Sequence, residues 1–420
     1  MAIVAGSGRA PSAVEAPVPL PTNLAALPQL LAYAQALDLA GHLQRRKRGL
    51  TALVLALLWL VLAWRGSGRP QHVVLIDDPL LLALLGLKRL PTDRTLRRSL
   101  RHFSAHGVRR AVEVAYLAEL PKRVGQVWAA IDAHQIPYWG RGKLDHFQKG
   151  WSGSHNRRLR GYRLYLVIDT DTGQVITYVL ARGRKRDHHL LALLARRARQ
   201  LLGLRLAGIV ADCGFTSRAA VAALLAAKIP FILGFARSAP IRQQLAALTP
   251  QQRRWVRTGK AIRLGACAWD TRLRLFALGA RSPADRRGPW VYVTSLRSVG
   301  PQRLAQLYRQ RWRAEQAIEE LLNGNDLDHL VSYDLPANRV AIGLRLLARN
   351  LAIGLQIATA HARPPTIREP RAVRAAFVDG LATFHLVHRT IHLRPLHPPA
   401  PRAHQCWRLP WSRRTVRLSA

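Results

Sequence analysis

The sequence predicts an α/β protein built on a mixed sheet, and the order of its apolar segments supports this. A first predicted strand, VWAAIDAHQIPYW, begins near Val127. Two further apolar runs, RLYLVIDT and QVITYVLA, are joined by residues 169–173, whose Asp, Thr and Gly residues are typical of a hairpin turn. Helical and strand-like segments then alternate: HHLLALLARRARQLLG, LRLAGIVAD, SRAAVAALLAAK and PFILGFA. Three strands followed by alternating helix and strand indicate a mixed sheet flanked by helices.

The regions around this sheet divide the chain into four predicted parts. Residues 1–28 are rich in Ala, Pro and Ser and are expected to form a mobile leader. Residues 29–125 have helical periodicity and predict an N-terminal helical domain for DNA binding or dimerisation. Residues 126–330 would form the catalytic domain, with a β-rich insertion at about 237–290 and one long helix from Gln302 to about Asn323. Residues 331–420 would form a C-terminal helical region and a basic tail.

One helix of the N-terminal part carries a stripe of arginines. Thr92 or Asp93 is expected to cap a helix whose outer faces carry Arg94, Arg97, Arg98 and Arg101. Such a helix could lie on DNA, or it could be an ordinary solvated face. The sequence supports both interpretations.

The apolar segment from Leu50 to Trp64 is too short to cross a membrane. It has fifteen residues where about 20 are needed for a helix to span a bilayer, and no small-residue cleavage site follows it. We therefore predict a buried core helix, no membrane association and no targeting segment.

The charge balance indicates a polyanionic partner. The chain has 65 Lys and Arg against 23 Asp and Glu, a formal net charge of +42. Nucleic acid is the expected partner, because each phosphate that a cationic side chain neutralises releases counterions and so gains affinity. An Arg-rich coding bias is the alternative, but it does not account for the scarcity of acids. The three cysteines lie far apart with no metal-ligand spacing, which fits a reducing, cytoplasmic setting.

Because acids are scarce, three carboxylates stand out by their position. Asp132 lies within the first predicted strand, Asp212 ends the buried strand GIVAD, and Glu315 lies on the predicted long helix. Ligands of α/β proteins gather at the carboxyl ends of strands. Two-metal phosphoryl transfer needs carboxylates that converge on ions about 3.5–4 Å apart, and oxygen ligands suit Mg²⁺ or Mn²⁺. Each acid alone also has an ordinary explanation as a turn, a cap or half of a surface ion pair.

Three sequence blocks resemble a known family. IDAHQIPYWG, ADCGF and YRQRWRAE are similar to the signature blocks of bacterial insertion-sequence DDE transposases, in the group with a β-strand insertion before the catalytic Glu. The similarity extends from about Asp78 to Asn350. It implies a ribonuclease-H-like fold, catalytic and metal-binding roles for Asp132, Asp212 and Glu315, and two Mg²⁺ or Mn²⁺ ions per site.

The helix signature of that family is Tyr, Arg, Glu and Lys at fixed spacing. Tyr308, Arg311 and Glu315 match it, and offsets of three and seven residues would keep them on one helix face. The resemblance implies DNA contact for Tyr308 and Arg311. This chain departs from the pattern at Leu322, where the family has Lys, and at Cys213, where Arg is common.

Further DNA contacts are expected in two basic segments. The segment from Gly140 to Gly161 is predicted to be a loop in which aromatic residues are interleaved with cations, and a second basic turn precedes His188. The candidate DNA-binding residues are Lys143, Lys149, Arg157, Arg158, Arg160, Arg184 and Lys185. Positive charge would bind the backbone and the rings could hold an unstacked base. Within the insertion, Trp255, Trp269 and Trp290 could stack a base or lie in the core.

These observations predict a DNA transposase that cuts the ends of a mobile element and joins them to target DNA. The expected partners are double-stranded DNA, as terminal inverted repeats and target, and further copies of the chain, as a homodimer or larger synaptic complex. The expected location is the prokaryotic cytoplasm, associated with the nucleoid. The alternatives are a metal-dependent nuclease, a decayed transposase that only binds DNA, and a non-catalytic nucleic-acid binder.

Overall fold

The structure is a computed structural model. The residues that it describes are 19–24, 27–43, 52–123, 125–142, 144–152, 155–181, 186–279, 289–359, 372, 378–379, 381–395, 406–409 and 414–418. The predicted mobile leader lies largely outside these residues. Leu20–Thr22, within the predicted leader, forms the short strand β1, which pairs with a strand from the other end of the chain.

The N-terminal part is helical, as predicted. Its helices are α1 (Leu27–Ala36), α2 (Leu39–Leu43), α3 (Ala52–Trp64), η1 (Pro70–Ile76), α4 (Pro79–Leu85), α5 (Asp93–Ser99), η2 (Leu100–His102), α6 (Ala105–Leu117) and η3 (Leu120–Lys122). The Thr92 hydroxyl accepts a hydrogen bond from the Thr95 amide and caps α5. Helix α3 is apolar on every side and buried from Val54 to Trp64, which confirms a core helix.

The central sheet has the predicted topology. Its first strands are β2 (Val127–Pro137), β3 (Gln148–Ser152), β4 (Arg157–Asp169) and β5 (Val175–Leu180), and α7 (Asp187–Leu202), η4 (Gly203–Arg205), β6 (Leu206–Ala211), η5 (Cys213–Phe215), α8 (Arg218–Ala226) and β7 (Phe231–Phe235) follow. The strands lie in the order β5-β4-β2-β6-β7. Strand β4 is antiparallel to β2 and β5, whereas β6 is parallel to β2 and to β7. This is the ribonuclease-H-like arrangement.

Alternation along the strands divides the core into two layers. On β2, Ala130 and Ile136 pack with the core on the side of α12 (Trp312–Asn325) and α13 (Leu335–Thr359), whereas Ala129 and Ile131 pack with the core on the side of α7 and α8. Successive side chains of a strand point to opposite faces. The even-numbered positions of β2, Asp132 included, therefore face the layer that contains α12 and α13.

Part of the predicted basic loop is a β-ribbon. The prediction of a loop from Gly140 to Gly161 was wrong for β3 and for the first residues of β4, which pair in antiparallel register (Lys149 with Arg160, Trp151 with Arg158). The high content of cations and glycines obscured the alternation of the strand, which only cross-strand pairing completes.

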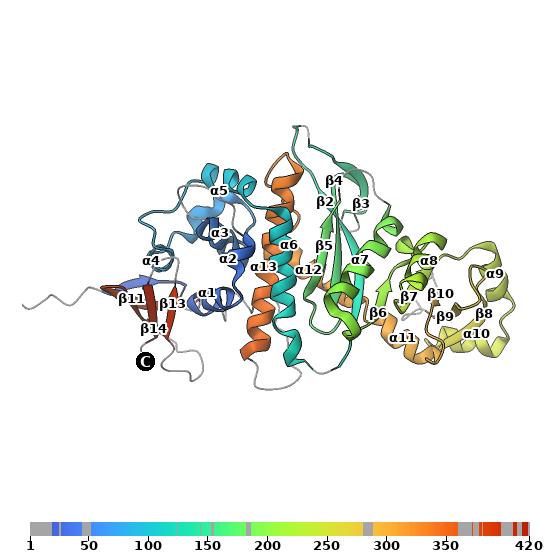
Figure 1. Ribbon diagram of the computed structural model, residues 1–420. Coiled ribbons are helices and arrows are strands. Elements are labelled where there is room, and N and C mark those ends of the chain that lie inside the picture. The colour runs from blue at the N-terminus through green and yellow to red at the C-terminus, as the bar shows by residue number, and fades with distance from the viewer. Residues whose placement is uncertain are drawn as a thin grey trace, which may run out of the picture.

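The insertion extends the same sheet. It begins with α9 (Ala239–Ala246) and α10 (Pro250–Arg257) and continues with β8 (Ala261–Ala266) and β9 (Arg274–Leu278), before β10 (Trp290–Thr294). Strand β10 pairs with β7, and β9 and β8 follow. The insertion is therefore helical in its first half and β-rich in its second, and Figure 1 shows it at the end of the molecule opposite the N-terminal helices.

The predicted long helix is interrupted. Helix α11 (Pro301–Arg309) ends before Gln310 and Arg311, and α12 begins at Trp312. The prediction of one continuous helix was wrong, although Arg311 keeps right-handed helical backbone angles. The interruption lies next to the signature residues.

Helix α13 is the central helix of the molecule. It lies beside α6 and α3, as Figure 1 shows. By length and composition the stretch Leu335–Ala358 could cross a membrane, but 94% of its most apolar window is buried inside the protein, as expected for a core helix.

The C-terminal region contains strands where a basic tail was expected. Strands β11 (Ala382–Val387), β12 (Thr390–Pro395), β13 (Cys406–Leu409) and β14 (Arg414–Leu418) form a second sheet in the order β1-β11-β12-β14-β13. Pairing with β1, more than 350 positions earlier in the chain, is a long-range contact that local periodicity does not reveal.

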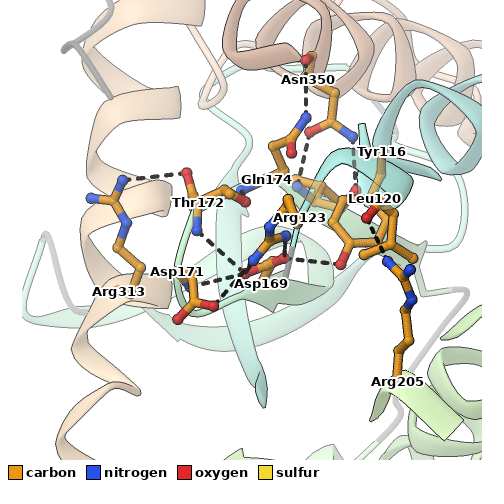
Figure 2. Close-up of polar contacts among 11 residues, drawn as sticks. Tyr116, Leu120, Arg123, Asp169, Asp171, Thr172, Gln174, Arg205, Arg313 and Asn350 are labelled. Atoms are coloured by element: carbon orange, nitrogen blue, oxygen red, sulfur yellow. Dashed lines mark hydrogen bonds and ion pairs between the residues drawn. The ribbon is translucent and has the colours of Figure 1, made fainter. Parts of the chain in front are cut away.

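The turn between β4 and β5 is held by a buried carboxylate, shown in Figure 2. Asp169 is fully buried and accepts hydrogen bonds from the Asp171 and Thr172 amides, the Tyr116 hydroxyl (2.9 Å) and the Arg123 guanidinium. The prediction that Asp169 and Asp171 form a hairpin turn is confirmed. A carboxylate with this many donors has a structural role.

Candidate active site

The register of the sheet brings Asp132 next to Asp212. Ile131 of β2 is the parallel partner of Ala211 of β6, and each acid is the next residue on its strand. Adjacent strands lie about 4.8 Å apart, so the two backbones are close neighbours. Asp132 accepts a hydrogen bond from the Ala133 amide (2.7 Å), and Asp212 accepts one from the Gly214 amide (2.9 Å) as it caps η5.

The position of Asp212 depends on a glycine in the neighbouring strand. A Cβ atom on Gly234 of β7 would lie 2.7 Å from the Cys213 amide nitrogen and 3.1 Å from the Asp212 carbonyl carbon. The Thr216 hydroxyl donates to the Gly234 carbonyl (2.6 Å) and fastens the turn after Asp212 to this strand. Gly234 therefore permits a close approach that a larger residue would prevent.

Arg311 connects Asp132 to Glu315. Its Nη1 atom lies 3.6 Å from Asp132 Oδ2, and its Nη2 atom donates a hydrogen bond to Glu315 Oε1. The side chains of Arg311 and Asp132 are 19% and 15% exposed, whereas that of Glu315 is 56% exposed. One guanidinium thus compensates carboxylates that belong to a strand and to a helix.

Burial and mutual repulsion shift the titration of the strand acids. Desolvation raises the pKa of Asp132 to about 6, and the charges of Asp212 and Glu315 act in the same direction, although Arg311 opposes them. Desolvation also raises the pKa of Asp212, again against the effect of Arg311. Burial opposes the charge of Arg311, but Tyr308, Glu315 and Asp132 outweigh it and raise the pKa of the guanidinium. Carboxylates that disfavour one another's charge form a site where a cation is stabilised.

A cavity of about 660 Å³ opens beside these residues. Asp212, Glu315 and Arg311 line it, together with aromatic side chains from β7 and β10 and from α11 and α12. The aromatic members of this wall are Phe235, Trp290, Tyr292, Tyr308 and Trp312.

Tyr308 connects the insertion to Arg311. Its ring centroid lies 4.1 Å from that of Tyr292 on β10, and the Arg311 guanidinium carbon lies 6.0 Å from the Tyr308 ring centroid. Burial raises the pKa of Tyr308, so the phenol stays neutral. The tyrosine therefore packs against the arginine and can fix its direction.

Only one of the three insertion tryptophans reaches the cavity. Trp290 lines it and is 39% exposed. Trp269 packs on Phe235 (4.6 Å between centroids) at the edge of the core, and Trp255 lies near the Lys260 ammonium.

A fourth carboxylate, which the sequence analysis did not identify, lies close to Asp212. A Cβ atom on Gly214 would lie 3.2 Å from Asp212 Oδ1 and 3.5 Å from Asp187 Oδ2, and the Asp187 charge raises the pKa of Asp212. Asp187 begins α7 and accepts hydrogen bonds from Arg163 (2.8 Å) and from the Tyr165 hydroxyl (2.9 Å). An acid at a helix start is so common that no signal in the sequence marks it.

The predicted basic residues lie away from the acids. Lys149, Arg157, Arg158 and Arg160 are exposed on the ribbon of β3 and β4. Arg160 is six residues along β4 from Leu166, the partner of Asp132, which corresponds to about 20 Å at roughly 3.3 Å per residue. Lys143, Arg184 and Lys185 lie outside the described residues.

The two departures from the helix and strand signatures have different environments. Leu322 lies about two helical turns beyond Glu315 and packs, partly buried, against the core. The neighbouring Asn323 is exposed. Cys213 lies beside Asp212, and partial desolvation and the charge of that acid raise the pKa of its thiol.

The donor set fits a hard cation, although its present geometry holds a guanidinium. Among the described residues, no group of three or more His, Cys, Asp or Glu side chains is arranged as a metal site. Asp132 and Glu315 nevertheless pair with one positive charge, that of Arg311, and the same charge acts to lower the pKa of Asp212. Oxygen donors and excess negative charge are what Mg²⁺ and Mn²⁺ require.

The comparisons with known proteins assign a family to this chain. No curated protein matches it. A solved structure described as a piggyBac transposase synaptic complex with hairpin DNA is similar, with 13% identity, a TM-score of 0.48 and coverage of 83% of this chain and 76% of that chain. The family described as the transposase DDE domain matches residues 126–351, more than half of the chain. This match spans the sheet, the insertion and all three acids, and the chain therefore belongs to the transposase DDE-domain family.

Proposed function

We propose that this protein is a DNA transposase that cleaves phosphodiester bonds at the ends of a mobile element and joins the freed ends to target DNA. Asp132, Asp212 and Glu315 are its catalytic residues. The observation that carries the proposal is the convergence of these acids from β2, β6 and α12 on a single positive charge. The same three acids lie within the matched family domain.

The three carboxylates would hold two Mg²⁺ or Mn²⁺ ions. When bound, such ions activate a water nucleophile and stabilise the charge that develops on the leaving oxygen. The chain contributes the ligands and their alignment: two acids fixed by the sheet register and a third on a helix, with an exposed and therefore adjustable side chain. This geometry supports both hydrolysis at the element end and attack by a DNA 3′-hydroxyl at the same site.

Arg311 is suited to hold a DNA phosphate while the acids bind cations. Its planar guanidinium can donate two parallel hydrogen bonds to a phosphate, and Tyr308 packs against it from the insertion side. Trp290 and Trp312, which are 39% and 50% exposed in the cavity wall, offer ring faces for a base. Tyr308 and Arg311 are thus the DNA-binding residues nearest to the acids.

The ribbon of β3 and β4 would hold DNA farther from the cut. Lys149 and Arg158 are exposed and have no ion-pair partner within the described part of the chain. Arg157 and Arg160 lie against the rings of Trp139 and Phe147 (5.5 and 4.5 Å), which keeps their charges at the surface. The net charge of +42 and the exposed cations of this ribbon favour double-stranded DNA as the partner. The DNA would be both the terminal repeats and the target.

Assembly and location follow from this reaction. Two element ends must be held together before they are joined, so a homodimer or a larger synaptic complex is expected. The protein would act on prokaryotic nucleoid DNA in the cytoplasm. A metal-dependent nuclease that has kept the fold is the second candidate, because Leu322 replaces the lysine of the family signature.

Cleavage of DNA that carries the element ends tests the proposal. With Mg²⁺, Asp132→Asn, Asp212→Asn and Glu315→Gln should each lower the cleavage rate at least about 100-fold, because each removes charge that the transition state needs. Glu319→Gln is the matched control, since Glu319 is an exposed acid on the same helix. Binding of the same DNA in EDTA should persist in every variant.

Two outcomes would contradict the assignment. A wild-type cleavage rate in any of the three variants would remove that residue from the site. Cleavage without joining of a labelled 3′ end to a target plasmid would favour the nuclease.

A further inference from the structure

A second cavity lies at the far end of β2, outside the candidate active site. It measures about 880 Å³ and opens between α5, the end of β2 and the segment that leads into α13. We call it the α5 groove and define it by three sets of lining residues. They are the arginines Arg94, Arg97 and Arg98 of α5 with Arg101 of η2, the aromatic residues Tyr138, Trp139 and Tyr333, and the segment Asp328–Ser332.

Two of the arginines that line the groove have no acidic partner among the described residues. Arg94, Arg97 and Arg98 follow the spacing i, i+3 and i+4, which places them on one side of α5, away from the buried Leu96 and Ser99. Arg101 donates two hydrogen bonds to Asp334 (3.1 and 3.2 Å), and Arg97 pairs with Asp93 at 3.6 Å. The exposed side chains of Arg94 and Arg98 have no hydrogen bond or ion pair to any described residue. Two unpaired cations therefore line the groove.

The aromatic wall is held in place by its neighbours. The rings of Tyr138 and Tyr333 meet edge to face at 6.2 Å, and the Tyr138 hydroxyl donates to the Gly142 carbonyl (2.9 Å). The Asp145 amide donates to the Tyr333 carbonyl (2.9 Å). A Cβ atom on Gly142 would lie 2.9 Å from the Tyr333 ring, so the loop packs directly on it. Tyr333 is nevertheless 61% exposed and Trp139 58%, which leaves ring surface for a ligand.

A buried arginine holds the backbone behind the groove through hydrogen bonds. Arg345 is fully buried and donates to the carbonyl oxygens of His329 (2.7 Å) and Gly68 (2.9 Å), two segments that border the groove. Rigid walls reduce the entropy lost on binding.

Strand β2 links the groove to the candidate active site, because Asp132 lies on this strand and Pro137 at its end lines the groove. His134 lies two residues after Asp132 and so points to the same face of the sheet. The His134 Nε2 atom and Asp328 Oδ1 lie 2.6 Å apart, and Asp328 lines the groove. The groove therefore lies at the carboxyl end of the strand that carries Asp132.

We propose that the α5 groove is a second DNA-contact site, which binds the sugar–phosphate backbone through Arg94 and Arg98 and stacks one unpaired base on Tyr333. Guanidinium groups without carboxylate partners favour phosphate, and exposed rings favour the face of a base. A groove of this volume has room for a displaced nucleotide as well as the backbone. The inference rests on the proposed function, since it assigns a further segment of the DNA path to this chain.

The backbone contact is tested by the salt dependence of binding. The probe is a fluorescein-labelled 30-bp duplex of arbitrary sequence, and fluorescence anisotropy is measured with the full chain in EDTA at several NaCl concentrations. Each phosphate contact contributes about 0.9 to the slope of log K against log [salt]. Arg94→Gln with Arg98→Gln should weaken binding and reduce the slope by about 2.

The matched control removes the same charge from other helices. Arg196 on α7 and Arg254 on α10 are exposed and also have no side-chain partner among the described residues, so Arg196→Gln with Arg254→Gln should leave the slope unchanged. Equal slopes for the two double variants would overturn the backbone contact. All four positions are exposed, so both variants are expected to fold.

The stacked base is tested with a second duplex that carries a two-nucleotide bulge containing 2-aminopurine. Tyr333→Ala should lower affinity for the bulged duplex roughly fivefold or more relative to the unbulged one, and Tyr333→Phe should not. Binding should quench the 2-aminopurine fluorescence in the wild type and in Tyr333→Phe. Equal losses on both duplexes would overturn stacking at Tyr333.

These measurements are independent of catalysis, because no divalent ion is present. If the chain bound DNA through the groove but never cleaved it, the inference would stand and the proposed function would fail. If cleavage required Asp132 while the slopes of the two double variants agreed, the proposed function would stand and the groove would be excluded.

Discussion

The guanidinium of Arg311, at the break between α11 and α12, lies 3.6 Å from the Asp132 carboxylate in the middle of β2 and also binds Glu315. One side chain thus neutralises acids that lie almost two hundred positions apart in the chain. Its charge occupies the region where divalent cations would be expected.

Arg311→Gln should therefore destabilise the protein without metal and increase its response to Mg²⁺. Removing one partner of a largely buried ion pair leaves the other uncompensated, and we expect a loss of about 2 kcal/mol in the free energy of unfolding. A divalent cation can replace the missing charge. Urea unfolding in EDTA and with Mg²⁺ in large molar excess over the protein would measure both effects. An equal stabilisation by Mg²⁺ in wild type and variant would contradict the proposal that Arg311 and the cations share one site.

Asp132 should make the metal-free protein less stable as pH rises from about 4 to about 6. Its folded pKa is about 6 against an ordinary value of 3.8, so in this window the folded state binds more protons than the unfolded state. The contribution of Asp132 to the free energy of unfolding is fully present below the ordinary pKa of 3.8. It is lost as pH rises through the folded pKa of about 6, and the loss is about 3 kcal/mol for this shift.

Asp132→Asn should abolish that pH dependence and be more stable than wild type at pH 7 in EDTA. Parallel urea titrations of the two proteins from pH 4 to pH 8 would measure the difference. A wild-type pH profile in the variant would assign the dependence to another group.

The buried acid of the β4–β5 turn should matter for stability and not for chemistry. Asp169→Asn removes a charge that Arg123 and Tyr116 hold in the interior, at a cost of about 3 kcal/mol. Asp171→Asn is the control, because that side chain is 55% exposed and its pairing with Arg123 should contribute at most about 1 kcal/mol. Similar costs for the two variants would contradict the assigned role.

Restoring the family lysine should not increase activity in this chain. Leu322 packs partly buried against the core, so Leu322→Lys should cost about 1 kcal/mol and leave the cleavage rate unchanged. Leu322→Met is the matched variant that keeps the apolar volume. A clear gain in cleavage by Leu322→Lys would show that the position reaches DNA.

Local patterns predicted the central fold well. Alternation and turn residues predicted β2, β4, β5, β6 and β7 in order, and Thr92, one of the two expected caps, begins α5. These features are encoded by neighbours in the sequence, so they can be found without tertiary information.

Other features depend on contacts between distant segments. The ribbon of β3, the pairing of β1 with β11 and the break at Arg311 have weak local signals, because pairing or packing partners decide them. The same holds for Asp187, which lies close to Asp212 only because α7 packs against the turn that follows β6.

The sequence by itself determined the class of the sheet, the three candidate acids and a net charge that favours nucleic acid as the partner. The periodicity of apolar residues, the order of the segments and the composition can all be read from the sequence without knowledge of tertiary contacts. Only the tertiary structure decided which cation the acids share, which tryptophan reaches the cavity and where the α5 arginines face aromatic rings. Those relationships arise from strand register and helix packing, and both are settled by residues far apart in the chain.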